Sequence, residues 1–459
     1  MNLRLSPFAA LLAALLQIGC AGPTSQPNII LLFSDDAGYA DFGFQGSPDI
    51  KTPNLDRLAA SGIRFTNGYV SASVCAPSRA GMLTGRYQQR FGFEYNLPGK
   101  PDPDVPDSAR GLPLSELTIA NHLKNLGYAT GLIGKWHQGL EDHFHPLNRG
   151  FDEFFGMRSG GSGYLTGNAR HIEDGFHPVD PASIGYLTDE FGARAADFVQ
   201  RHREHPFFLF LSFNAPHTPM EAKPAYLTQA RADYETTLRA TNAAMTRSLD
   251  ENVGRVLDMV REQGLEENTL IVFVNDNGGA MPYNGSLNAP LRGTKGTALE
   301  GGNRVPFLVS WPGRVDASTV YQAPVSTMDL LPTFLTAAGG HSLPSLDGVD
   351  LLPFLTGQSA GVPHDTLYWK LNWGAAIRVG DWKLVRTPAD DYWIFFLATD
   401  PGERNNLAAT ETGRVNGLRS ALESWEAELP APIWVSEDIW RQHSMDRYDQ
   451  ALVDGYIRQ

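Results

Sequence analysis

The sequence has almost no cysteine: Cys20 and Cys75 are the only two in 459 residues. Two thiols cannot form a disulfide framework, and no Cys-x-x-Cys or His-x-x-x-His spacing indicates a zinc site. No repeat of fixed period and no low-complexity tract is present either. Any thiol that remains in an oxidising compartment therefore needs an explanation, because it must be buried, paired or chemically converted.

Basic residues are also few. The chain has 37 Lys and Arg against 51 Asp and Glu, a formal net charge of -14, which argues against nucleic-acid binding. If the substrate is an anion, a local cluster of cations has to attract it. Hydrophobic residues make up 42%, with 46 Gly and 31 Pro, which is typical of a loop-rich globular protein. The length suits one large domain and a smaller one.

Long hydrophobic runs are missing except near the N-terminus. That run is too short to cross a bilayer as a mature helix, but it has the size of a signal-peptide core. Residues 18–20 (IGC) resemble the end of a bacterial lipobox, although Gln17 stands where leucine is usual. We predict that residues 1–21 are a lipoprotein signal, with a lipid anchor at Cys20. The small residues around Cys20 also suit ordinary cleavage and plain secretion. Either way the protein is expected to be exported, to the periplasm or cell surface, and Cys75 is its only remaining thiol.

Apolar runs alternate with amphipathic stretches over residues 27–350, a pattern that indicates βαβ units. Strands are expected at 28–33, 129–134, 206–213, 269–274 and 305–311, and helices at 116–128, 189–202 and 232–264. The run NIILLF (28–33) is continuously apolar, as expected of a strand covered on both faces. We therefore predict an α/β catalytic domain with a large, mainly parallel or mixed sheet flanked by helices.

The last part of the chain, residues 351–459, has a different pattern. AAIRVGDWKLVR and DYWIFFLATD are typical of short antiparallel strands, and GRVNGLRSALESWEAEL is typical of a packing helix. We predict a smaller C-terminal α+β subdomain built on a short antiparallel sheet, with the boundary near residue 350.

Oxygen ligands follow two of the predicted strands. Asp35 and Asp36 come after strand 28–33, and Asp276 and Asn277 come after strand 269–274. In an open α/β sheet, ligands bind outside the carboxyl ends of the strands. Three carboxylates at one place repel each other unless a cation neutralises them, and all-oxygen ligands favour Ca²⁺ or Mg²⁺. Taken alone, the SDD stretch could instead be a helix N-cap beside an exposed acid.

A second set of residues can carry positive charge: Arg79, Lys135, His137, His217 and Lys295. A tetrahedral anion needs fixed donors around its oxygens, and preorganised donors are usually the largest catalytic contribution. Each residue alone has a structural alternative, such as a solvated turn lysine or a hydrogen-bonded histidine. Their combination with the acids indicates an active site that handles an anion.

A family resemblance starts at Cys75. CAPSRAGMLTGR (75–86) matches the Cys-x-Pro-x-Arg signature of the sulfatases, and the similarity covers nearly the whole mature chain. Further motifs in the family's order are DDAGYADFGFQG (35–46), GYATGLIGKWHQG (127–139), PHTP (216–219), NDNGG (275–279), PLRGTKGTALEGGNRVP (290–306) and LATDPGERNNLA (397–408). Gln138 departs from the usual leucine and Asn275 from the usual serine, at positions not expected to touch the reacting groups. The chain thus resembles the formylglycine-dependent, arylsulfatase-like enzymes of the alkaline phosphatase superfamily, which implies that fold.

The resemblance explains the lone thiol. In sulfatases a maturation enzyme oxidises this cysteine to formylglycine, and Pro77 and Arg79 help that enzyme to recognise the segment. The hydrated aldehyde carries two hydroxyls on one carbon, so one can attack sulfur and the other can then expel sulfate. A serine or cysteine nucleophile would leave a stable sulfated enzyme.

Roles carry over position by position. The resemblance implies that one Ca²⁺ is held by Asp35, Asp36, Asp276, Asn277 and the modified residue 75. It also implies that Arg79 orients the diol, that Lys135 and Lys295 neutralise sulfate oxygens, that His137 orients the diol or regenerates the aldehyde, and that His217 with Lys295 protonates the leaving alcohol.

We therefore predict a sulfuric ester hydrolase that acts on an exported substrate, a sulfated glycan. One alternative is a phosphonate monoester or phosphodiester hydrolase of the same superfamily. The other is a catalytically silent glycan-binding lipoprotein, which would be expected to lack a metal ligand or Cys75. Segments 87–113 and 156–178 are expected to line the sugar subsites, with Tyr87, Arg90, His143, His145 and His171 as candidates.

Overall fold

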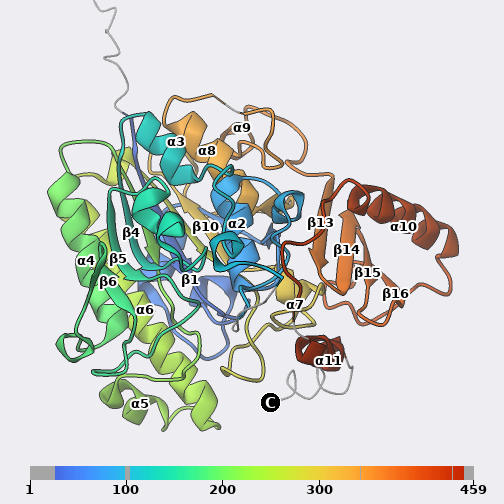
Figure 1. The fold of residues 1–459 in the computed structure, drawn as a ribbon, viewed down its shortest axis with the longest axis horizontal. Coiled ribbons are helices and arrows are strands. Elements are labelled where there is room, and N and C mark those ends of the chain that lie inside the picture. The colour runs from blue at the N-terminus through green and yellow to red at the C-terminus, as the bar shows by residue number, and fades with distance from the viewer. Residues whose placement is uncertain (1–25, 99–103, 342, 437, 449–459) are drawn as a thin grey trace, which may run out of the picture.

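The computed structural model describes residues 26–98, 104–341, 343–436 and 438–448, and the predicted signal at 1–21 lies outside them. Its centre is a ten-stranded mixed sheet (Figure 1). In spatial order the strands are β11 (Thr319–Tyr321), β2 (Ile63–Phe65), β10 (Phe307–Ser310), β9 (Thr269–Asn275), β1 (Asn28–Ser34), β8 (Phe207–Ser212), β4 (Ala129–Lys135), β5 (Glu153–Met157), β6 (Ile172–Asp174) and β7 (His177–Pro178). A two-stranded sheet pairs β12 (Val325–Ser326) with β3 (Gly68–Tyr69).

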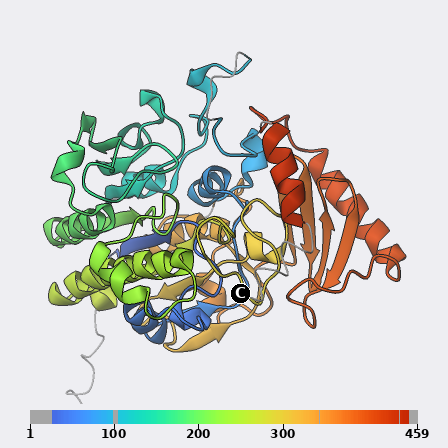
Figure 2. The same ribbon diagram turned by 90° about the horizontal axis from the view of Figure 1, so that it is seen from below.

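Helices cover both faces of the large sheet (Figures 1 and 2). The described helices of this part of the chain are α1 (Pro53–Ala60), α2 (Cys75–Thr84), α3 (Ile119–Asn125), α4 (Leu187–His202), α5 (Pro224–Ala230), α6 (Thr237–Glu262), α7 (Glu300–Asn303), α8 (Leu330–Ala337) and α9 (Leu352–Leu355), of which α5 packs on α6. Among the described helices, none is both long and apolar enough to cross a membrane.

The alternation of side chains along β1 shows why its sequence is apolar throughout. Ile30 and Leu32 join a core cluster with residues of α1, α4 and α6, whereas Ile29 and Leu31 join a second cluster with residues of α3 and α8. Successive side chains of a strand point to opposite faces, so a strand buried on both faces has no polar alternation. The predicted α/β class and the flanked, mixed sheet are confirmed.

The long helical stretch predicted at 232–264 is shorter than expected. Helix α6 begins only at Thr237, because the Thr236 hydroxyl accepts a hydrogen bond from the Arg239 amide (3.1 Å) and caps it. Residues 232–236 of the predicted stretch instead form turns and bends between α5 and α6. The pairs β5–β6 and β6–β7 at one edge of the sheet were not predicted, since β6 and β7 are too short to show a period.

The C-terminal part contains the predicted antiparallel sheet. Its strands are β13 (Thr366–Leu371), β14 (Gly374–Val379), β15 (Trp382–Arg386) and β16 (Tyr392–Phe396), and they pair in chain order. Helix α10 (Thr412–Glu426) packs against this sheet. Helix α11 (Asp438–Tyr448) lies beneath α7 (Figure 1), and its last residue, Tyr448, joins a core cluster with residues of the same sheet. The division of the chain at residue 350 stays a prediction.

A buried ion network joins the C-terminal sheet to helix α7. Lys383 of β15 contacts Glu300 Oε1 at 2.8 Å and Glu403 Oε1 at 3.0 Å, and all three side chains are buried. Glu300 is the first residue of α7, and its backbone amide donates a hydrogen bond to Glu403 Oε2 (2.6 Å). Glu403 is the glutamate of the motif LATDPGERNNLA. This motif therefore fastens the C-terminal sheet to the segment that follows Lys295.

We expect the stability of the protein to report on this network. Burial, and then the charge of Glu300, raise the pKa of Glu403 to about 7, against an ordinary 4.5. The folded state then binds more protons than the unfolded state between pH 4.5 and 7, so Glu403 makes stability fall as pH rises through this window. Glu403→Gln removes this dependence. The melting temperature of wild type minus that of Glu403→Gln should decrease from pH 4.5 to 7, and an increase would contradict the assignment.

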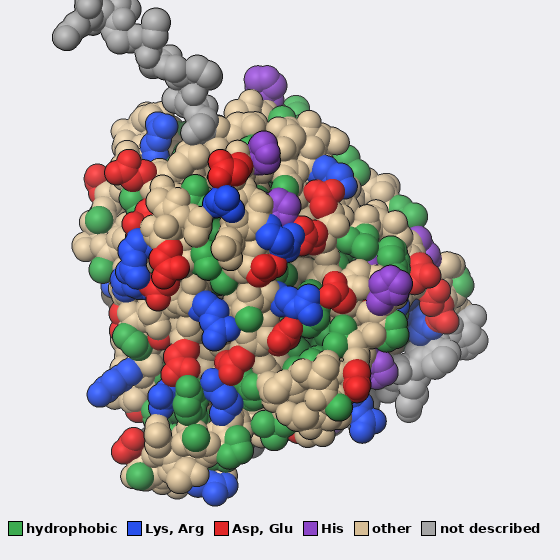
Figure 3. Space-filling model, turned by 90° about the vertical axis from the view of Figure 1, so that its left-hand side faces the viewer, with side chains coloured by type: hydrophobic (Ala, Val, Ile, Leu, Met, Phe, Trp, Pro, Cys, Tyr) green, Lys and Arg blue, Asp and Glu red, His purple; other side chains and the backbone are tan. Residues whose placement is uncertain are grey.

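The outer face over α4 carries interspersed charges of both signs (Figure 3). Arg194 pairs with Glu190 (2.9 Å) and Arg201 with Glu153 (2.7 Å) on this face. Exposed pairs of this kind contribute little to stability. They show that the negative net charge is not concentrated here as one acidic surface.

Candidate active site

Four neighbouring parallel strands deliver the polar side chains to one edge of the sheet. Strands β9, β1, β8 and β4 lie side by side and run in the same direction, with Ser34 of β1 opposite Asn275 of β9. Asp35 and Asp36 therefore follow β1 beside Asp276 and Asn277, which follow β9. The juxtaposition predicted from the strand ends is what the structure has.

Cys75 is the first residue of α2, a helix whose every residue is buried. Its Sγ lies 3.6 Å from Asp35 Oδ1, 3.9 Å from Asp36 Oδ1 and 3.0 Å from Lys295 Nζ. Burial acts to raise the pKa of the thiol, but the charges of Lys135 and Lys295 outweigh burial, so the pKa is lowered. The lone thiol is thus held between acids and lysines and is not an inert core residue.

Asp36 is the most connected acid of the site. Lys295 Nζ lies 2.7 Å from its Oδ1, Asn277 Nδ2 donates to Oδ1 at 2.7 Å, and His217 Nε2 lies 3.5 Å from Oδ2. Burial acts to raise the pKa of Asp36, but Lys295 and His217 outweigh it and lower the pKa. The carboxylate is therefore held in its charged form.

Arg79 and Lys135 lie one layer deeper. Arg79 Nη2 contacts Asp276 Oδ2 at 2.9 Å and Asp35 Oδ2 at 3.7 Å, and Lys135 Nζ contacts Asp35 Oδ2 at 2.5 Å. Burial, and then the charge of Asp35, raise the pKa of Asp276 to about 6. Ser212 Oγ, which the sequence analysis did not single out, accepts a hydrogen bond from Arg79 Nη1 (2.6 Å) and holds the guanidinium in place.

The donor set fits a hard cation. Single ligand atoms of Asp35, Asp36, Cys75 and His217 all lie within 4.8 Å of one another. The buried Oδ1 of Asn277 receives no hydrogen bond from the described part of the chain, so it is available as a ligand. Asp276 is not in that four-residue group; its Oδ2 accepts a hydrogen bond from Arg79 and its Oδ1 one from the Asp36 amide (3.2 Å). Closely spaced acid oxygens with one free amide oxygen are a set that Ca²⁺ or Mg²⁺ suits.

The two histidines of the site differ in charge. Burial, then Lys135 and Arg79, lower the pKa of His137 well below its ordinary value, so its ring is neutral. Burial acts to lower the pKa of His217 too, but Asp35 and Asp36 outweigh it and raise the pKa. A neutral ring can accept a proton and a protonated ring can donate one. The predicted split between His137 and His217 is therefore chemically reasonable.

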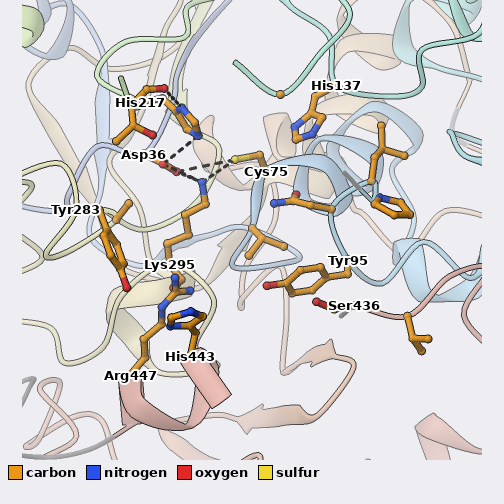
Figure 4. Close-up of a pocket in the computed structure, with 18 residues that line it drawn as sticks. Asp36, Cys75, Tyr95, His137, His217, Tyr283, Lys295, Ser436, His443 and Arg447 are labelled. Carbon is orange, nitrogen blue, oxygen red and sulfur yellow. Dashed lines mark hydrogen bonds and ion pairs between the residues drawn. The ribbon is translucent and has the colours of Figure 1, made fainter. Parts of the chain in front are cut away.

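A cavity of about 710 Å³ opens onto these groups (Figure 4). Asp36, Cys75, His137, His217 and Lys295 line it, together with the groups Val74, Tyr95–Pro98, Gly160, Thr218, Ala280, Tyr283, Val435, Ser436, His443 and Arg447. All ten residues predicted for catalysis or metal binding thus lie at this cavity or directly behind it. The His137 side chain lines the cavity but, unlike the other nine, makes no described hydrogen bond or ion pair with another of these ten residues.

The residues predicted as candidates for the sugar subsites do not line the cavity. The two predicted segments reach the cavity through Tyr95–Pro98 and Gly160, but none of the five named residues is among the described lining residues. The Tyr87 hydroxyl accepts a hydrogen bond from the Tyr368 amide, Arg90 pairs with Asp347, and His145 is buried against Phe176. Of the other two, His143 forms an exposed contact with the Ser108 carbonyl, and His171 is an exposed loop residue. Polar residue type alone could not separate these structural contacts from a binding role.

Comparison with known proteins decides the family. The sulfatase family model matches residues 27–340. The chain belongs to the sulfatase family. A second model, that of the N-sulphoglucosamine sulphohydrolase C-terminal region, matches residues 295–426 of this sulfatase. The matched ranges overlap over the segment that carries Lys295 and α7.

The relatives of this sulfatase are curated sulfatases of similar length. It is 33% identical to N-acetylgalactosamine-6-sulfatase of Sus scrofa over 454 residues, which covers 88% of this chain and 85% of the relative. It is 33% identical to arylsulfatase A of Homo sapiens over 490 residues, which covers 90% and 84%. The protein is therefore an enzyme that hydrolyses sulfate esters.

A solved structure agrees over nearly the whole chain. Ps i-CgsB superposes with a TM-score of 0.84 at 34% identity and covers 93% of this sulfatase and 100% of that chain. The same protein has been solved in complex with k-i-k-neocarrahexaose, with a TM-score of 0.83. The predicted alkaline-phosphatase-like fold is confirmed.

Proposed function

We propose that this sulfatase releases inorganic sulfate from an exported, sulfated carbohydrate by means of formylglycine at position 75 and a bound Ca²⁺. The relatives support the carbohydrate: one is named for N-acetylgalactosamine and another was solved with an oligosaccharide. The observation that carries the proposal is the position of Cys75, whose Sγ lies 3.0 Å from Lys295 and 3.6 Å from Asp35 at the cavity wall.

Residue 75 is proposed to act as the nucleophile after oxidation by a maturation enzyme. As the hydrated aldehyde it presents two hydroxyls where Sγ now lies. One hydroxyl attacks sulfur and displaces the alcohol, and loss of the second hydroxyl's proton lets the carbonyl re-form and expel sulfate. The neutral ring of His137, in the same cavity, is suited to accept that second proton.

Cations around the cavity are proposed to handle the charge of the sulfate. Lys295 borders the cavity beside Cys75 and can bind a sulfate oxygen directly. His217 borders it too and, being favoured in its protonated form, is placed to protonate the leaving oxygen. Lys135 and Arg79 act from behind, through Asp35 and Asp276.

The metal would be held by Asp35, Asp36, Asp276 and Asn277, together with residue 75. When bound, Ca²⁺ supplies Lewis-acid activation of the attacking hydroxyl and of a sulfate oxygen. The protein's own contribution is to shield these three acids and Asn277 from bulk solvent, since all four side chains are buried.

Export and anchoring rest on residues 1–21 and remain proposals. The basis is the signal-peptide pattern and the lipobox-like IGC at 18–20. Fractionation of host cells that make wild type or Cys20→Ser tests this: the membrane fraction should lose the protein when Cys20 is replaced. A soluble periplasmic wild type would instead favour plain secretion.

The function is tested by comparing two leaving-group-matched substrates. Purified protein from its native host should hydrolyse 4-nitrophenyl sulfate with a kcat/KM at least about a hundredfold above that for a 4-nitrophenyl phosphonate ester. Mass spectrometry of the peptide around residue 75 should show formylglycine. Faster phosphonate hydrolysis would favour the superfamily alternative, and an unmodified, inactive Cys75 would favour the silent binding protein. Sulfate release from a panel of sulfated oligosaccharides then identifies the sugar.

A further inference from the structure

One wall of the cavity comes from the C-terminal helix, which no sequence motif had linked to the site. His443 and Arg447 lie four residues apart on α11 and therefore share one face of the helix. Both line the cavity, below Lys295 and next to Tyr283 (Figure 4). This wall is distant in the sequence from every catalytic residue named above.

Arg447 is fixed against the catalytic segment. Its Nη1 donates a hydrogen bond to the Lys295 carbonyl (2.8 Å), and its Cζ lies 5.7 Å from the centre of the Tyr283 ring. The next residue, Tyr448, accepts a hydrogen bond from the Ala298 amide (2.6 Å) through its hydroxyl. The end of α11 is thus held at two points on the loop that carries Lys295.

The charge of Arg447 has no described counterpart. No carboxylate in the described part of the chain forms an ion pair with it, and its hydrogen bond goes to a backbone carbonyl. Asp36 is the one acid among the described lining residues, and Lys295 and His217 already engage it. A guanidinium that is fixed in this way and borders the cavity is suited to bind an oxyanion.

The neighbouring surface suits a sugar ring. Tyr283 is 52% exposed, Tyr95 lies across the cavity from it (Figure 4), and Leu97 and Pro98 also line the cavity. The Lys295 side chain runs from the Arg447 contact at its carbonyl to the Cys75 contact at its Nζ. The two anion-binding places are therefore separated by the length of one lysine side chain, a distance within reach of substituents on one sugar or on adjacent sugars.

We propose that Arg447, with His443 beside it, forms a second oxyanion subsite that binds a charged substituent of the carbohydrate other than the sulfate being cleaved. The shared chemistry of the ligand is a second sulfate or a carboxylate. The inference rests on the proposed function, because it specifies the substrate as a carbohydrate with at least two anionic groups.

Binding without turnover tests this subsite. In a Cys75→Ala background, calorimetry compares the affinities for two pairs of disaccharides. In the first pair, one disaccharide carries one sulfate and the other carries two. In the second pair, both carry one sulfate, and the second sugar is neutral in one member and a uronic acid in the other. The member with two anions should bind about ten- to a hundredfold more tightly in at least one pair. The pair that shows the preference distinguishes a second sulfate from a carboxylate.

Arg447→Gln is the decisive second change, because glutamine keeps an N–H for the Lys295 carbonyl but removes the charge. It should reduce the preference to less than about threefold, whereas Arg447→Lys, a point charge without the planar fork, should keep part of it. Gln442→Ala, at an exposed position of the same helix, is the matched control and should keep all of it.

Three results would overturn the inference: no preference in any pair, a preference that survives Arg447→Gln, or an equal loss of affinity for both members of a pair. The last would mean that Arg447 acts only by positioning Lys295. Failure of the proposed function is separate, because it would be seen as no sulfate release by the mature wild type, whatever the calorimetry shows.

Discussion

Cys75→Ala is expected to give a folded protein whose turnover of 4-nitrophenyl sulfate falls by at least about 10⁴-fold in kcat. The substitution removes the thiol that has to be oxidised before Cβ can become the aldehyde, and it leaves the buried helix α2 otherwise unchanged. Cys75→Ser should also lack steady turnover, because a serine hydroxyl that takes up sulfate has no second hydroxyl to expel it. An initial-rate assay with the melting temperature as the folding check measures both.

Ser78→Ala is the matched control for this experiment. Ser78 lies three residues further along α2 and is as buried as Cys75, and its hydroxyl has no hydrogen-bond partner among the described residues. Its replacement should change kcat by no more than a few-fold. Robust activity in Cys75→Ala would refute the mechanism, and equal losses in both variants would point to damage of the helix and not to loss of the nucleophile.

Asp36→Asn is expected to cause the second-largest loss, in metal content as well as in activity. Asparagine is chosen because residue 36 has a φ of 62°, a backbone conformation that asparagine tolerates better than most residues. The amide keeps the shape but removes the charge that faces Lys295 at 2.7 Å and His217 at 3.5 Å. We expect Ca²⁺ affinity to fall at least about a hundredfold and kcat at least about a thousandfold.

Metal analysis after dialysis at graded free Ca²⁺ measures the loss of Ca²⁺ affinity. An activity assay in excess Ca²⁺ then measures the loss of kcat separately from the loss of metal. Asp258→Asn, which breaks an exposed ion pair with Arg57, serves as the control and should retain metal and activity. Unchanged metal content in Asp36→Asn would contradict the ligand assignment, even if the activity were lost.

The central strands and the residues that follow them could be predicted from sequence because two signals coincide there. A fully apolar run such as 28–33 indicates a strand buried on both faces, and the parallel arrangement then brings Asp35 and Asp276 together. The same logic placed Lys135 and His217. The position of Cys75 required the family motif, since no strand leads into it.

The rest of the cavity could not be predicted, for a physical reason. Arg447 reaches the site only because α11 folds back onto the Lys295 loop, and a long-range contact of this kind leaves no local period or motif. Arg90 shows the opposite error: it lies in a segment that does border the cavity, yet its guanidinium is used by Asp347. Ser212 ends a buried strand, where a hydroxyl gives no sign that it supports an arginine.

The buried ion network of Lys383, Glu300 and Glu403 also bears on how the C-terminal sheet affects catalysis. Glu300 stands only five residues beyond Lys295, and the backbone carbonyl of Glu403 also accepts a hydrogen bond from Arg292 (3.0 Å), three residues before it. Both flanks of the catalytic lysine are thus tethered to the far sheet. Truncation of the chain at residue 350 would remove these contacts but keep every proposed catalytic residue. We therefore expect substitutions in the C-terminal sheet to reduce catalytic activity as well as stability.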